Sequence, residues 1–99
     1  MHAVVGVWTI AEDRRESQER ALRDVVPCVT TQPGFVAGYW MLDAETGKSH
    51  TTILLDSEES ARRFKALLLC NARAHARAGV TSDYLSVVDV VADAHRSSR

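Results

Sequence analysis

The chain has 99 residues, of which 45% are hydrophobic and 25% charged, as in a single soluble globular domain. Its formal net charge of −1 argues against nucleic-acid binding through bulk positive charge, so we expect no nucleic-acid partner. No apolar run reaches the roughly 18 residues that cross a membrane, and the first residues lack the pattern of a signal peptide. We therefore expect a cytoplasmic protein with no membrane partner.

The cysteines and histidines do not form a metal-binding pattern. Cys28 and Cys70 are the two cysteines, too few for a disulfide framework or a zinc motif. Both lie in segments with helical patterns, where we expect buried free thiols. His2 and His50 fall on strands that we expect to be neighbours, but a metal site needs three or four ligands. We predict no metal and no cofactor.

The first third of the chain predicts a strand followed by a helix. Residues 2–9 are apolar and rich in β-branched side chains. Residues 12–31 begin with charged side chains and continue with apolar ones at helical spacing. Pro27 lies inside this pattern and is expected to kink the helix or to end its first segment. Pro33 and Gly34 then close the region.

The middle of the chain predicts a β-hairpin. Residues 35–43 and 48–56 have the apolar and β-branched composition of strands. The link between them, residues 44–47, is short and ends in a glycine that is free to take a positive φ. So short a connection makes the two strands antiparallel neighbours.

A second helix and a fourth strand follow. Asp56 stands three residues before Glu59, a capping-box spacing that predicts a helix start. The helix extends to about residue 78, and Gly79 is a suitable stop. Residues 84–92 predict the fourth strand, and the chain becomes polar from about residue 93.

The order of these elements, β-α-β-β-α-β, predicts an α+β fold of the ferredoxin-like type in one domain over residues 1–99. The four strands form an antiparallel sheet, and right-handed crossovers place both helices on the same face.

The predicted sheet is apolar on both faces. In the second strand, Tyr39 and Met41 point away from Trp40 and Leu42, and neither set is polar. A sheet covered on one side only should have a polar open face. The simplest cover is a second copy of the chain, so we predict a homodimer through the sheet face. The alternatives are a monomer with a ragged apolar face and an unrelated protein partner.

Three features together resemble a known superfamily. They are the element order across residues 2–92, the stretch "PGFVAGYW" at 33–40, and the join "LLDSEESARRF" at 54–64. On these the chain resembles the dimeric α+β barrel superfamily, and within it the antibiotic biosynthesis monooxygenase domain and its small uncharacterised actinobacterial relatives. The resemblance implies a dimer with a pocket between sheet and helices. Some members oxidise aromatic polyketides without metal or flavin, and others open haem.

The residues used by haem-degrading members are largely missing. Those members use an Asn on the first strand, with a Trp and a His on the second helix. This chain has Val7 and Trp8 on the first strand, Phe64 where the Trp would stand, and His75 about two residues late. We therefore do not expect haem degradation.

Two residues of the second helix are the candidate catalytic groups. Asn71 and His75 are four apart and share a helix face with Phe64. His75 could act as a base near neutral pH, and Asn71 could hydrogen-bond a substrate oxygen. The alternative is that the apolar stripe tapers into polar residues, with His75 on the rim. Five aromatic side chains are the candidate substrate-binding residues, with core packing as their alternative role: Trp8, Tyr39, Trp40, Phe64 and Tyr84.

Two functions remain open at this point. One is a cofactor-independent monooxygenase acting on a small aromatic or polyketide-like substrate. The other is a non-catalytic homodimer that binds a small apolar ligand or has a stress or assembly role. They differ in whether His75 and Asn71 point into an enclosed cavity.

Overall fold

The structure is a computed structural model that describes residues 1–96 of the chain. Eight elements follow one another: β1 (His2–Ile10), the 3-10 turn η1 (Glu12–Arg14), α1 (Arg15–Thr30), β2 (Phe35–Leu42), β3 (Ser49–Leu55), α2 (Glu58–Cys70), α3 (Ala72–Arg77) and β4 (Val80–Asp89). Within these residues, none of the helices is both long enough and apolar enough to span a bilayer.

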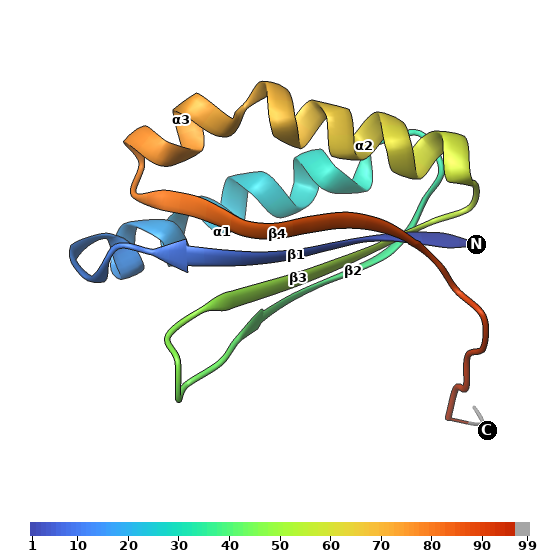
Figure 1. Ribbon diagram of the computed structural model, residues 1–99, viewed down its shortest axis with the longest axis horizontal. Coiled ribbons are helices and arrows are strands. Elements are labelled where there is room, and N and C mark those ends of the chain that lie inside the picture. The colour runs from blue at the N-terminus through green and yellow to red at the C-terminus, as the bar shows by residue number, and fades with distance from the viewer. Residues whose placement is uncertain (97–99) are drawn as a thin grey trace.

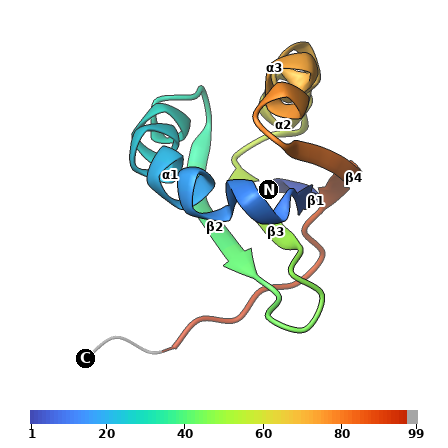
Figure 2. The ribbon, with the colours of Figure 1, turned by 90° about the vertical axis from the view of Figure 1, so that its left-hand side faces the viewer.

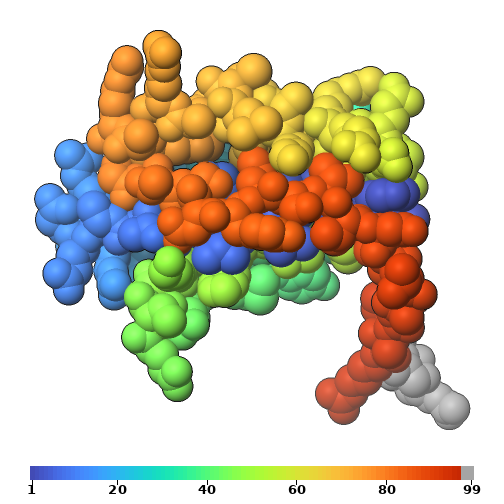
Figure 3. All heavy atoms as spheres, in the orientation of Figure 1, coloured from blue at the N-terminus to red at the C-terminus, as the bar shows by residue number. Residues whose placement is uncertain are grey.

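The four strands form one antiparallel sheet in the order β2-β3-β1-β4. Both α1 and the α2–α3 pair lie on the same face of this sheet (Figures 1 and 2). The β2–β3 turn and the segment after β4 project on the other side (Figure 3). The predicted ferredoxin-like α+β fold is confirmed.

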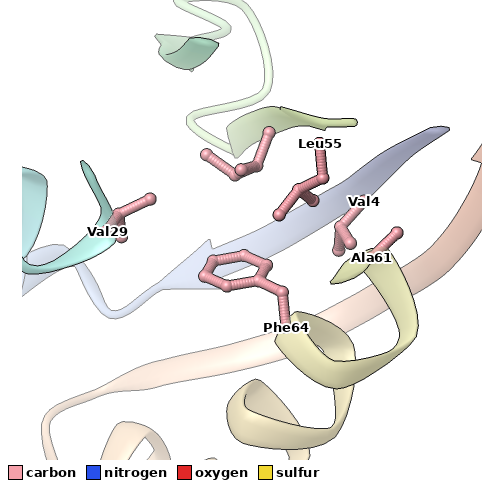
Figure 4. Packing of buried hydrophobic residues seen from close by; sticks show 6 residues of the cluster. Val4, Val29, Leu55, Ala61 and Phe64 are labelled. Atoms are coloured by element: carbon pink, nitrogen blue, oxygen red, sulfur yellow. The ribbon is translucent and has the colours of Figure 1, made fainter. Parts of the chain in front are cut away.

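The core lies between the sheet and α2. Val4, Ile53 and Leu55 project from β1 and β3 towards Ala61 and Phe64 of α2, and α1 adds Val29 (Figure 4). The strand residues share one face because they alternate along their strands and pair in register, Val4 opposite Ile53. Leu55 and Ala61 are completely buried, so the first turns of α2 are the most firmly anchored part of the helical layer.

The first helix differs from its prediction at both ends, and of the two effects expected of Pro27 the termination of the helix does not occur. Residues 12–14 form a 3-10 turn, and α1 proper runs from Arg15 to Thr30. Pro27 lies inside α1 without ending it. Proline has no backbone N–H, so one helical hydrogen bond is missing at Pro27. The burial of Val29 in the core, in the turn that follows, stabilises the end of the helix despite this loss.

The second helix is two helices. At Asn71 the backbone leaves helical geometry, with φ −95° and ψ 6°, so α2 ends at Cys70 and α3 begins at Ala72. The start also differs from the prediction, because Ser57 and not Asp56 is the N-cap. The Ser57 hydroxyl accepts a hydrogen bond from the backbone N–H of Ser60 at 3.1 Å.

The fourth strand begins earlier than predicted. It spans Val80–Asp89 in place of residues 84–92, because Val80 pairs with Ile10 at the far end of β1. The register shifts between Val7 and Trp8, where β1 and β4 form an irregularity. The prediction missed this part of the strand because it was based on apolar composition and residues 81–83 are polar.

The expectation of buried thiols is wrong. Cys28 and Cys70 are both free and exposed. Each lies on an outward-facing position of its helix, and next to Cys28 it is Val29 that enters the core. The helical spacing of the apolar residues in α1 was right, but Cys28 was assigned to the wrong side.

A polar cluster joins β1, β3 and β4 on the face away from the helices. Asp83 accepts a hydrogen bond from the Thr9 hydroxyl at 2.6 Å and forms an ion pair with Lys48 at 2.9 Å. The hydrogen bond from Thr9 and then that from Lys48 lower the pKa of Asp83. The cluster ties the chain just before β3 to the edge strand β4.

Acidification should remove the contribution of this cluster. A carboxyl whose folded pKa is depressed stabilises the fold above its unfolded pKa, about 3.9, and loses that contribution as the pH falls through the folded value. We expect wild type to be more stable than Asp83→Asn at pH 5–7, and the difference to shrink and then disappear as the pH falls through the folded pKa of Asp83. Urea unfolding at each pH measures it. A difference that stays constant over this range would contradict the assignment to Asp83.

Candidate functional site

A cavity of about 350 Å³ lies between the sheet and the helices. Its walls come from β1, β2 and β3 on one side and from α1, α2 and α3 on the other. The lining is mainly apolar and aromatic, and it includes Trp8, Leu22, Trp40, Phe64 and Leu68. The volume is in the range of small-molecule sites.

The two tryptophans on the sheet side of the cavity each lie over a glycine two residues earlier. A Cβ atom added at Gly6 would stand 2.8 Å from Nε1 of Trp8. One added at Gly38 would stand 3.1 Å from the ring of Trp40. The absence of these two Cβ atoms lets both indoles lie close to the sheet. The space above the rings is the cavity.

His75 lies where this cavity meets a second one. The second cavity, of about 240 Å³, is beneath α2 and α3 beside β4, and Trp8 and His75 line both cavities. The rings of Trp8 and His75 meet edge to face, with centroids 5.8 Å apart and planes at 81°. Nδ1 of His75 is buried and has no hydrogen-bond partner among residues 1–96. The imidazole is thus held by packing rather than by a polar partner.

The cavity has charged side chains on the α1 side. Arg15, Gln18 and Glu19 line it from the first turns of α1. The guanidinium of Arg15 packs against Gly47, whose φ of +73° shapes the β2–β3 turn. The polar groups of α1 and the imidazole of His75 therefore belong to different walls.

The structure brings four of the seven predicted site residues to the cavity. Three aromatic side chains, Trp8, Trp40 and Phe64, line it together with His75. Asn71 is exposed at the α2–α3 break and lines neither cavity, although its carbonyl still accepts the hydrogen bond from the backbone N–H of His75 at 3.0 Å.

The other two predicted residues lie on the face of the sheet that points away from the helices. Tyr39 is 55% exposed and Tyr84 51% exposed, and neither lines the two cavities. Tyr39 and Trp40 do point to opposite faces, as their adjacency requires. Sequence reasoning missed Arg15 and Leu22 of α1. The apolar stripe of that helix was the signal that could have placed Leu22.

Within the described part of the chain, no group of three or more His, Cys, Asp and Glu side chains is arranged so that it could hold a metal ion. His2 and His50 lie on neighbouring strands, as predicted, but on opposite faces of the sheet. His2 lies 3.7 Å from a carboxylate oxygen of Asp89 and 3.8 Å from one of Glu58.

The face of the sheet away from the helices is largely apolar at its surface. Besides the two tyrosines, Met41 and Val88 leave large side chains exposed there. The register places Tyr39 opposite Thr52, and Val7 opposite both His50 and Tyr84, so these side chains share one face over all four strands. We refer to this surface, from Tyr39 on β2 to Tyr84 on β4, as the open face.

Solved structures share this fold, although the sequence matches no family profile and no curated protein. A candidate antibiotic biosynthesis monooxygenase from Deinococcus radiodurans aligns over 99% of this chain and 100% of its own, with a TM-score of 0.79 and 12% identity. MupZ from Pseudomonas fluorescens aligns over 87% of this chain and 65% of its own, with a TM-score of 0.66 and 11% identity. At these identities the likeness establishes the fold alone.

Proposed function

We propose that this protein binds a small aromatic or polyketide-like compound in the cavity between sheet and helices and oxidises it with dioxygen, without a cofactor. The observation that carries the proposal is the cavity itself, which is apolar, lined by Trp8, Trp40 and Phe64, and provided with one imidazole, that of His75. A site of this kind favours a flat apolar ring system with few polar groups. The likeness to a candidate monooxygenase supports the choice of reaction.

The proposed reaction needs little from the protein. An anthrone, for example, loses a proton to give an enolate, which reacts with dioxygen. The ring CH₂ becomes a carbonyl, and the second oxygen atom leaves as water. The protein would hold the ring between the indoles and the α2 side chains. His75 would form a hydrogen bond with the oxygen on which the enolate charge accumulates.

Oxygen consumption with a panel of anthrones and quinols tests this function. We expect turnover by the wild type, and a loss of about a hundredfold or more in His75→Leu, because one hydrogen-bonding group at a developing charge contributes on this order. Asn71→Ala is the matched control, since Asn71 is four residues away and outside the cavity. Turnover that falls equally in both variants would reject the special role of His75.

Binding without oxygen consumption would favour the alternative function. One observation supports that alternative: no carboxylate in residues 1–96 forms an ion pair with His75, so a conventional base dyad is missing. In that case the protein is a small-ligand carrier or sensor with the same cavity. Calorimetry with the same panel of compounds separates the two outcomes.

We also propose that two copies pair through the open face. The exposed side chains of this surface, Tyr39, Met41, Tyr84 and Val88, form an apolar area that monomeric proteins rarely leave uncovered. The β2–β3 turn and the segment after β4 rise on this side and would flank the second copy (Figures 1 and 2). A two-fold axis would bring each open face against its equivalent.

Light scattering at micromolar concentration should give about twice the chain mass of 10.9 kDa. Tyr39→Glu should shift the protein to the monomer, because it places an unpaired charge within the proposed interface. Asp24→Lys, at an exposed position of α1 on the opposite face of the sheet, changes charge outside the proposed interface and should remain dimeric. A wild type that scatters as a monomer would refute the dimer.

A further inference from the structure

The two nitrogen atoms of His75 have different surroundings. Nδ1 is enclosed by protein atoms and has no partner among the described residues. Nε2 of the same ring is not closed off in this way, and the ring lines both cavities. A ligand in the cavity can therefore form a hydrogen bond with His75 only through Nε2.

This asymmetry determines where the proton of the neutral ring belongs. A neutral imidazole carries one N–H donor and one bare nitrogen. A proton on Nδ1 would be a buried donor without an acceptor, which is among the rarest arrangements in folded proteins. A proton on Nε2 is free to meet a ligand or water. When His75 is neutral, the ring therefore exposes a donor to the cavity.

The same asymmetry opposes the action of His75 as a base. A base acting through Nε2 must keep its own proton on Nδ1, and after the transfer it carries protons on both nitrogens. In histidine bases a carboxylate or a carbonyl normally accepts that Nδ1–H. The neighbour that packs on His75 is the ring of Trp8, at 5.8 Å, which offers no such acceptor.

We propose that His75 donates a hydrogen bond from Nε2–H to an acceptor oxygen of the ligand, and that it does not remove a proton from the ligand. This deepens the proposed function and depends on it. It narrows the ligand class to flat aromatic compounds with a ketone, quinone or phenolate oxygen. In the oxidation proposed above, the donor would stabilise the oxygen of the enolate, and the proton would leave by way of solvent.

The tautomer can be read in the free protein by nitrogen-15 NMR. Two-bond proton–nitrogen correlations of His75, assigned by comparison with His75→Gln, should show a protonated Nε2 and a bare Nδ1 above pH 7. The reverse pattern would overturn the inference. This readout needs no ligand, so it stands whether or not the proposed function is correct.

Ligand binding gives the second test. Fluorenone has an acceptor oxygen, and fluorene has the same ring system without one. We expect the wild type to bind fluorenone about tenfold more tightly than fluorene in calorimetry, and His75→Leu to bind both alike. His75→Gln places an amide N–H₂ near the position of Nε2 and should restore most of the preference. His75→Asn, whose shorter amide stands near the position of Nδ1, should not.

The outcomes separate the two proposals. If neither compound binds the wild type, the aromatic-ligand function fails. If both bind equally, or if His75→Leu keeps the preference for fluorenone, the cavity stands and the donor role of His75 is overturned. If His75→Leu and His75→Gln both weaken the binding of fluorenone and of fluorene to the same extent, the donor role of His75 is also rejected. That result would mean that His75 acts on the ligand by packing alone.

Discussion

Replacing Phe64 by alanine should lower the free energy of unfolding by about 3–5 kcal/mol, the range for deleting a buried aromatic ring. Phe64 is 4% exposed and packs among Val4, Ile53 and Leu55. It also borders the cavity, so the surroundings cannot close easily over the space that it leaves. Urea unfolding of wild type and variant measures the change.

A matched control lies three residues further along the same helix. Leu67 is 40% exposed, so Leu67→Ala removes an apolar side chain from a partly exposed position. Its cost should remain below about 1 kcal/mol. Because domains of this size have about 5–15 kcal/mol of stability, Phe64→Ala should be close to unfolding and Leu67→Ala should not. Similar costs for both would show that the core is elsewhere.

A single methyl group at Gly6 should weaken ligand binding. The new Cβ would stand 2.8 Å from Nε1 of Trp8, closer than side chains approach one another, so the indole must rise from the sheet. The indole can rise only into the cavity that it lines. We expect Gly6→Ala to weaken aromatic ligands by at least about tenfold and to cost about 1–3 kcal/mol, as for an overpacked core. Calorimetry and urea unfolding measure the two effects.

Two further variants isolate the cause. In Gly6→Ala combined with Trp8→Phe, the smaller ring no longer meets the new methyl group, so stability and some affinity should return. Gly38→Ala should have a milder effect, because its Cβ would contact Ile53 at 3.0 Å and Trp40 at 3.1 Å. If Gly6→Ala binds ligand as tightly as the wild type, the indole does not form the floor of the cavity.

The fold could be predicted from local patterns because each element carries its own signal. The hairpin at 35–55 followed from two apolar segments around a short link with Gly47, and its strands were correct to within one residue at each end. The ends of β4 were not predictable in this way. Residues 81–83 near its start are polar and exposed, and only pairing with the far end of β1 makes them part of a strand.

The cavity was less predictable than the fold because it depends on contacts between distant segments. Helical spacing placed Asn71 one turn before His75, but it did not show that Asn71 stays at the surface and lines neither cavity. Tyr39 and Trp40 had to face opposite ways, yet the sequence did not say which of them met the helices. Nothing in the sequence indicated that Gly6 and Gly38 make room for the indoles of Trp8 and Trp40, because this role depends on how the rings lie in the folded sheet.

The break at Asn71 divides the helical layer into a fixed part and a loosely held part. Helix α2 buries Ala61 and Phe64, whereas α3 has six residues and buries none of them. A helix this short is not stable by itself, so α3 should open locally far more often than α2. Its backbone amides should then exchange with deuterium fastest among the helices. His75 belongs to α3. The helix that contacts the ligand is therefore also the one whose local opening would let the ligand enter the cavity.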